Sequence, residues 1–370
     1  MAGEYFTNRA QEVKRIRRAM REPSRLLVYG PRRMGKSSAI HVAGESFRRE
    51  GGLLVRADLG GATSVTEMTD RLLTSLARQS PSRDSQWLAE WVRALQLELT
   101  ADSSGAPVLR LRFGPRETRQ RQAEGLPGLE EVLNRLNDLA GHRAEGVCVA
   151  LDEFQRMVDF GPPRAAWELR DLMQGHHNLS YVCAGSEETV IEELTARDGP
   201  FHGTFERLFV GEIDPGHFAR WIDDRLRSGG LDEVEGIGNA AIQEAGPRTE
   251  DVLKLARQVW FRGAARGVLE PDDIRAALSD IVRGDRGVFE RLWSHLSPHH
   301  RDVLRAVAGG ARALTSGEVR RRYGLRSASA VSQAVDTLIG RGLLARRAGR
   351  VTFDDPFLGA WVREESPPGL

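Results

Sequence analysis

The chain has 370 residues, which is longer than a typical single domain, so we expect two or three domains. Its 53 basic and 52 acidic residues leave a net charge of +1, which excludes a strong overall attraction to nucleic acid or to membranes. Its two cysteines, Cys148 and Cys183, lie in apolar strand-like runs and argue against a disulfide framework or a zinc site.

Hydropathy gives no sign of a membrane protein. No stretch approaches 18 apolar residues, and residues 1–5 lack the pattern of a signal peptide. From the sequence we therefore expect a soluble, cytoplasmic protein with no membrane partner.

The first elements of the chain predict a short helix that leads into a strand. Within residues 5–22 the apolar side chains of Val13, Ile16 and Met20 recur at helical spacing. The apolar run at residues 26–29 then has the composition of a buried strand. A strand is therefore expected directly before residue 30.

Residues 30–38 form a phosphate-binding motif. They fit the pattern G-x-x-x-x-G-K-[ST] at every fixed position and lie between a predicted strand and a predicted helix, which disfavours the alternative of a glycine-rich turn. Lys36 is expected to reach the β- and γ-phosphates, and Ser37 to offer its hydroxyl to Mg²⁺. Main-chain N–H groups and the helix dipole would hold the phosphates. The expected nucleotide-binding residues are Gly30, Pro31, Arg32, Arg33, Met34, Gly35, Lys36, Ser37 and Ser38.

The region after this motif is less regular. Residues 53–58 predict a strand and residues 65–77 a helix. Residues 80–128 contain scattered proline, serine, glycine and arginine, and only residues 108–113 alternate as a strand would. We interpret residues 80–128 as an insertion or a partly mobile lobe. Helical periodicity returns at residues 129–139.

A second informative stretch is the apolar run at residues 147–151, which is followed by Asp152 and Glu153. Such a run is typical of a strand buried on both faces of a parallel sheet, and ligands of these sheets bind at the carboxyl ends of the strands. Asp152 is therefore expected to hold the shell of a Mg²⁺ ion. Glu153 is expected to orient or activate the attacking water.

A third apolar run, at residues 180–185, leads to Ser186. This serine either contacts the γ-phosphate or the water as a polar sensor, or is an ordinary turn residue. Predicted strands and helices alternate up to residue 213. We therefore expect the α/β class, with a P-loop ATPase core over residues 1–213 that has a parallel sheet flanked by helices.

Beyond the core the pattern turns helical and predicts a lid over residues 214–287. A Gly-Pro break at residues 246–247 separates two of its helices and is followed by Arg248. Arg248 either faces the nucleotide, linking its phosphate state to the angle between domains, or is an exposed arginine in an ordinary turn.

Residues 288–370 predict a winged-helix domain, because three short helices precede a hairpin with a basic tip. Arginine exceeds the acidic residues in this part of the chain. Winged helices bind DNA, but they also serve as protein-docking modules or lids. The candidate contacts to double-stranded DNA are Arg321, Arg326, Gln333, Arg346, Arg347 and Arg350.

In these motifs the chain resembles the archaeal-type ATPase family, in the STAND branch of AAA+-like P-loop NTPases, and more distantly the Orc1/Cdc6 initiators. The resemblance rests on short stretches spread over nearly the whole chain. These stretches are Phe6-Thr7-Asn8-Arg9, residues 30–37, Leu151-Asp152-Glu153-Phe154-Gln155, Gly185-Ser186, and residues 355–361.

The resemblance implies an ATPase core, a helical lid and a winged helix, with exchange of ATP for ADP acting as a switch. It also implies that Arg9 frames the adenine pocket; on the sequence alone, Arg9 is equally well a solvated arginine. The chain departs from the family after the serine strand, where Gly203 is followed by Thr204 in place of arginine.

From the sequence we expect a slow, Mg²⁺-dependent ATPase whose nucleotide state controls a winged helix that engages DNA or a partner protein. The alternative is a regulatory or defence-system module that holds ATP or ADP with little or no turnover. Self-association is a further option for the protein partner.

Overall fold

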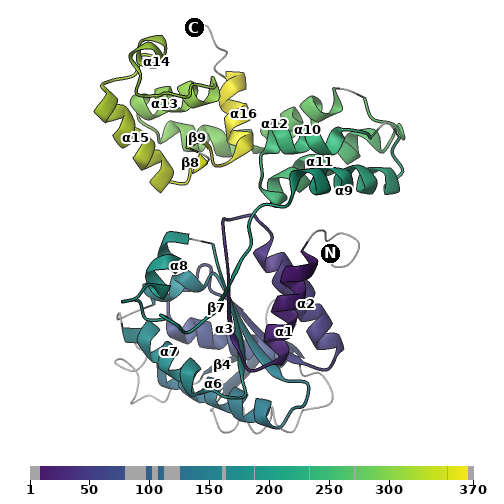
Figure 1. Ribbon diagram of the computed structural model, residues 1–370, viewed down its shortest axis with the longest axis vertical. Coiled ribbons are helices and arrows are strands. Elements are labelled where there is room, and N and C mark those ends of the chain that lie inside the picture. Colours follow the sequence, from purple (N-terminus) through teal and green to yellow (C-terminus); the bar gives the residue numbers. More distant parts are fainter. Residues whose placement is uncertain are drawn as a thin grey trace. The chain divides into compact units, whose positions relative to one another are not determined.

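A computed structural model divides the chain into two compact units, Met1–Gly211 and Glu212–Leu370. It describes residues 9–79, 97–101, 107–111, 126–160, 164–186, 188–232, 234–270, 272–347 and 349–365. The first unit is built around a sheet with helices on both faces, and the second is mostly helical (Figure 1). Within these ranges, no helix is long and apolar enough to span a membrane.

The main sheet of the first unit has five strands in the order β2-β5-β6-β1-β7, and all neighbouring strands are parallel. This order places β1 between β6 and β7, and β6 between β1 and β5. It confirms the α/β class and the flanked parallel sheet that the sequence predicts. The strands are β1 (Arg25–Tyr29), β2 (Leu53–Asp58), β5 (Val147–Asp152), β6 (Ser180–Gly185) and β7 (Glu206–Phe209).

Both faces of this sheet are buried because its central strands are apolar at successive positions. In β5, Cys148 and Ala150 pack in one layer, whereas Val149 and Leu151 pack in the other. Burial raises the pKa of the Cys148 thiol to about 12, as expected for a core cysteine. The flanking helices are α1 (Ala10–Arg21), α2 (Lys36–Arg49), α3 (Val65–Gln79), α6 (Leu126–Gly141), α7 (Arg164–Gly175) and α8 (Glu188–Thr195), with the 3₁₀ helix η1 (Phe154–Asp159) after β5.

Most of the expected insertion at residues 80–128 lies outside the described residues. The part that is described includes an antiparallel pair of strands, β3 (Leu97–Ala101) and β4 (Pro107–Leu111). Strand β4 overlaps the stretch whose alternation predicts a strand.

The second unit begins with a helical part and ends with three helices, a hairpin and a last helix (Figure 1). The helical part is α9 (Pro215–Ser228), α10 (Ile237–Ala245), α11 (Thr249–Gly263) and α12 (Asp273–Ser294). The rest is α13 (Pro298–Ala308), α14 (Gly317–Arg322), α15 (Ala328–Gly340), β8 (Leu344–Arg347), β9 (Arg350–Phe353) and α16 (Pro356–Glu365).

Side-chain caps determine where several of these helices begin. Each capping oxygen accepts a hydrogen bond from the backbone N–H three residues further on, which satisfies one of the amides left unpaired at a helix start. The capping residues are Asp214 for α9, Ser297 for α13, Ser316 for α14 and Ser327 for α15.

One hydrophobic core runs through the whole second unit. The same cluster of buried residues includes Phe218 of α9, Leu255 of α11 and Trp361 of α16. Helix α12 continues across residue 287, where the sequence suggests a domain boundary, and Phe289 in its last turns is buried. The helical part and the winged helix therefore pack as a single unit.

The contact between α9 and α10 depends on Gly238. A Cβ atom at residue 238 would lie 2.2 Å from the carbonyl oxygen of Ala219, which is backbone and cannot move aside. We expect Gly238→Ala to destabilise the second unit by about 1–3 kcal/mol. Thermal unfolding of the full chain, compared between the variant and wild type, measures this loss of stability.

Gly284→Ala is the matched control, since a Cβ atom added at this position of α12 would have no neighbouring atom within 4 Å. There we expect a gain of up to about 1 kcal/mol, because alanine favours a helix more than glycine. Equal melting temperatures for the two variants would contradict the close approach of α9 and α10.

Candidate functional site

The residues singled out in the first unit meet at one edge of the sheet. Parallel strands have their carboxyl ends at a common edge. Residue 30 follows β1, Asp152 ends β5, and Ser186 follows β6. Because β6 lies between β1 and β5, Ser186 stands between the loop and the carboxylates.

The loop after β1 has an unusual backbone. Gly30, Arg33 and Gly35 have φ of 141°, 65° and 88°, in the region that disfavours side chains. A Cβ atom at Gly30 would lie 2.4 Å from the carbonyl oxygen of Val210, so only glycine fits there. Gly35 caps helix α2, so the N–H groups of that helix start face the loop. Nζ of Lys36 donates to the carbonyl oxygens of Gly30 (2.8 Å) and Pro31 (2.7 Å).

Arg9 braces the loop after β1 through hydrogen bonds from its guanidinium. Its guanidinium is buried, with 5% of the residue exposed, and donates to the carbonyl oxygens of Met34 (3.1 Å) and Gly211 (2.5 Å). It also pairs with Glu12 at 3.1 Å. Arg9 thus ties the loop to the segment after β7, whereas its expected contact with adenine stays a prediction.

Asp152 lies directly against the start of α2. Its carboxylate accepts hydrogen bonds from the Ser37 hydroxyl and from the N–H of Glu153 (3.1 Å). Burial raises the pKa of Asp152, and the charges of Asp58 and Glu153 raise it further, although the two hydrogen bonds act against this. Sequence reasoning missed Asp58, which ends β2 in register with Asp152. Only the sheet order, which pairs β2 with β5, reveals it.

Glu153 and Ser186 are joined by a hydrogen bond. Ser186 Oγ donates to Glu153 Oε2 at 2.8 Å, and Nε of Arg32 donates to the same serine oxygen at 3.3 Å. Gln155 also donates to Oε2 of Glu153. Loop, serine and carboxylate therefore form one connected network.

Arg248 lies in the second unit, at the start of α11. It is buried and donates to the carbonyl oxygen of Asp354 (2.7 Å) and to the Asp354 carboxylate. Arg347 approaches the same carboxylate at 3.8 Å. Burial lowers the pKa of Arg347, and the charge of Arg248 lowers it further. Arg248 thus attaches the helical part to the turn between β9 and α16, and its expected contact with nucleotide stays a prediction.

The candidate DNA-binding side chains differ in exposure. Arg347 is half-buried beside Asp354, whereas Arg346 is exposed and pairs with Asp336 at 2.7 Å. The remaining four are exposed: Arg321, Arg326, Gln333 and Arg350.

Comparison with known proteins agrees with these observations. The family model described as a probable winged helix domain matches residues 287–364. Among solved structures, the chain is similar to the Walker-type ATPase PABY2304 of Pyrococcus abyssi, with a TM-score of 0.63, 18% identity and 97% of each chain covered. The fold is that of a P-loop ATPase with a winged helix. The resemblance predicted from the sequence is thus confirmed at the level of the fold.

A second similar structure is the ORC1 protein of Aeropyrum pernix in complex with DNA. Its TM-score is 0.51 at 17% identity, over 98% of this chain and 94% of that chain. The ORC2 protein of the same organism, solved with ADPNP and ADP, has a TM-score of 0.50 at 15% identity, over 99% and 96%. A search of curated proteins gave no match.

The side chains at the P-loop fit Mg²⁺. Ser37 and Asp152 supply two neighbouring oxygen donors, and Mg²⁺ is bound through a few protein oxygens, phosphate oxygens and water. No group of three or more histidine, cysteine or acidic side chains among the described residues is arranged to hold a metal by itself. The two protein oxygens would leave the remaining positions around such an ion to phosphate oxygens and water.

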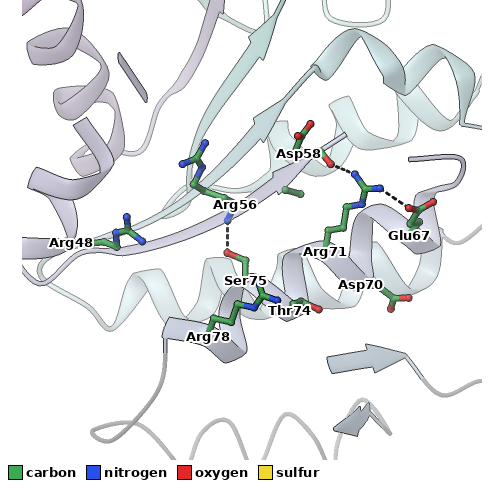
Figure 2. Close-up of a pocket in the computed structure, with 10 residues that line it drawn as sticks. Arg48, Arg56, Asp58, Glu67, Asp70, Arg71, Thr74, Ser75 and Arg78 are labelled. Carbon is green, nitrogen blue, oxygen red and sulfur yellow. Dashed lines mark hydrogen bonds and ion pairs between the residues drawn. The ribbon is translucent and has the colours of Figure 1, made fainter. Parts of the chain in front are cut away.

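A cavity of about 760 Å³ lies beside the P-loop site, on the outer side of β2. Figure 2 shows its arginines and acidic residues on β2, α3 and the end of α2. Arg71 pairs with Glu67 at 2.6 Å, and Ser75 accepts from the N–H of Arg56 at 2.8 Å. No residue of the P-loop lines this cavity, and Asp58 belongs to both places.

The bracing role of Arg9 gives a testable expectation. Arg9→Ala would remove the donor to the buried carbonyl oxygen of Met34 and to the partly buried one of Gly211, which costs about 1–3 kcal/mol. We expect a lower melting temperature and weaker binding of nucleotide, measured by calorimetry and by titration with a fluorescent ADP analogue. Arg18→Ala in the same helix is the control, because its side chain is 75% exposed and its pair with Glu22 contributes little. Similar losses for the two variants would refute the brace.

Proposed function

We propose that the chain is a Mg²⁺-dependent ATPase that works as a slow switch, in which the nucleotide state controls the winged helix. The observation that carries the proposal is the connected network at the carboxyl edge of the sheet. There the P-loop, the Ser37–Asp152 pair and the Glu153–Ser186 pair come together. These are the parts that binding and hydrolysis of a nucleoside triphosphate require.

Each side chain has a distinct task in this proposal. The N–H groups of the P-loop and Lys36 bind the phosphates, and Arg9 keeps the loop in shape beside the adenine pocket. Ser37 and Asp152 hold Mg²⁺, which supplies positive charge to the phosphates. The preference for adenine rests on the family resemblance.

Hydrolysis converts ATP and water into ADP and phosphate. The water oxygen forms a bond to the γ-phosphorus while the bond from that phosphorus to the β–γ bridging oxygen breaks. Glu153 takes the proton that the water loses. Ser186, which hydrogen-bonds both Arg32 of the P-loop and Glu153, would contact the water or the γ-phosphate.

The output of the switch is proposed to run through Arg248. Its guanidinium holds Asp354 at the base of the winged helix, and a phosphate is a competing anionic partner for a guanidinium. Recruitment of Arg248 by nucleotide would release Asp354 and so link the phosphate state of the nucleotide to the winged helix.

For the winged helix we propose contact with double-stranded DNA. Its exposed arginines support this, and the ORC1 structure of the same fold is a complex with DNA. The alternative is protein docking, which the uncharged and exposed side chains of Ser329 and Ser332 in α15 favour.

The central test is Glu153→Gln. We expect ATP binding within about twofold of wild type and hydrolysis lowered at least about tenfold, because a water-activating group is lost. Turnover by phosphate release and affinity by titration measure the two effects. Lys36→Ala is the comparison, since it should lose binding itself. Wild-type protein that binds ATP but shows no turnover, with or without DNA, would favour the nucleotide-holding module.

The DNA proposal predicts a salt-dependent affinity. We expect the triple replacement of Arg321, Arg326 and Arg350 by glutamine to weaken binding at least about tenfold and to reduce the slope of log affinity against log salt by about one unit per lost phosphate contact. Fluorescence anisotropy with duplex DNA measures both quantities.

The control replaces Arg275 and Arg283 of α12, whose side chains are 84% and 77% exposed but lie outside the winged helix. It should bind as wild type does. Association that is absent, or that does not respond to salt, would point to a protein partner instead.

A further inference from the structure

The burial of Gln155 is not explained by a contribution to the stability of the fold. It lies in η1, two residues after Glu153, and only 1% of it is exposed. Its Nε2 donates to Glu153 Oε2 and, at 3.4 Å, to Ser186 Oγ. Its Oε1 is buried and has no hydrogen-bond partner among the described residues. A buried oxygen without a donor is unfavourable, so a methionine or leucine would suit the core better.

The orientation of this amide follows from its neighbours. The opposite orientation would place Oε1 against the carboxylate of Glu153, with two oxygens facing each other and no proton between them. Oε1 instead lies near Gly185, where an added Cβ would come within 3.0 Å of it. The absence of a side chain at Gly185 thus leaves room for the amide.

Glu153 itself is held under strain. Its φ of 52° lies in the left-handed region, which a glutamate rarely adopts. Such a conformation persists when surrounding contacts enforce it. In the part of the chain that the structure describes, the hydrogen bonds to its carboxylate come from Gln155 and Ser186, and both reach the same oxygen, Oε2.

We propose that Gln155 is a positioning residue for hydrolysis. Together with Ser186 it binds Oε2 of Glu153, which holds the carboxylate in place and leaves Oε1 to take the proton of the attacking water. Gln155 neither gives nor accepts that proton. Through Ser186 and Arg32 the same contact links the carboxylate to the P-loop. The inference rests on the proposed ATP hydrolysis and adds a residue to it.

The test is Gln155→Met, which keeps the size of the side chain and removes the N–H donor. We expect kcat to fall at least about tenfold, with KM and ADP affinity within twofold of wild type. The melting temperature should stay the same or rise, because an unsatisfied buried oxygen is removed. A merely structural role predicts the reverse, a lower melting temperature with kcat little changed. Gln11→Met, at an exposed position of α1, is the control.

A double-mutant cycle separates the role of Gln155 from general damage. If Gln155 acts through Glu153, adding Gln155→Met to Glu153→Gln should change the single-turnover rate by less than twofold. A further loss in that background would overturn the proposal, as would an unchanged rate for Gln155→Met alone. Wild-type protein without turnover would overturn the proposed hydrolysis and this role with it, whereas active wild type and equally active Gln155→Met would overturn this role alone.

Discussion

The position of β6 between β1 and β5 is the constraint on which the candidate site depends. Because the three strands are parallel and adjacent, the P-loop, Ser186 and the carboxylates of Asp152 and Glu153 emerge side by side. Backbone pairing in the sheet therefore brings most residues of the network together. Few side chains then need to be placed by local contacts, and Gln155 is one of these.

Each of the two units contains a buried arginine that joins two segments of the chain. In the first unit, buried Arg9 ties two segments distant in sequence through their carbonyl oxygens. In the second, buried Arg248 ties the helical part to the winged helix through Asp354. A guanidinium carries several donors in a fixed plane, so it can satisfy acceptors from separate segments at once. In both places its loss would remove a direct contact between segments that lie far apart in the sequence.

Much of this arrangement could be predicted from the sequence, because the P-loop and the strand ending in Asp152 carry their signal in a few adjacent residues. Contacts between residues far apart in the sequence could not be predicted in this way. Asp58 joins the site only through the pairing of β2 with β5, and the partners of Gln155 emerge only once β6 is placed. Arg346 and Arg347 look alike in sequence, yet successive residues of a strand face opposite sides, so one is exposed and the other is half-buried.

The shared core of the second unit has a consequence for how this part of the chain can be exchanged between proteins. Helix α12 has side chains in the core on both sides of residue 287, so a cut at that position would leave each fragment with an unfinished helix and exposed apolar surface. Gene fusion or domain swapping would have to move α9–α16 together. The helical part and the winged helix are therefore expected to be inherited together, and to be transplanted together in protein design.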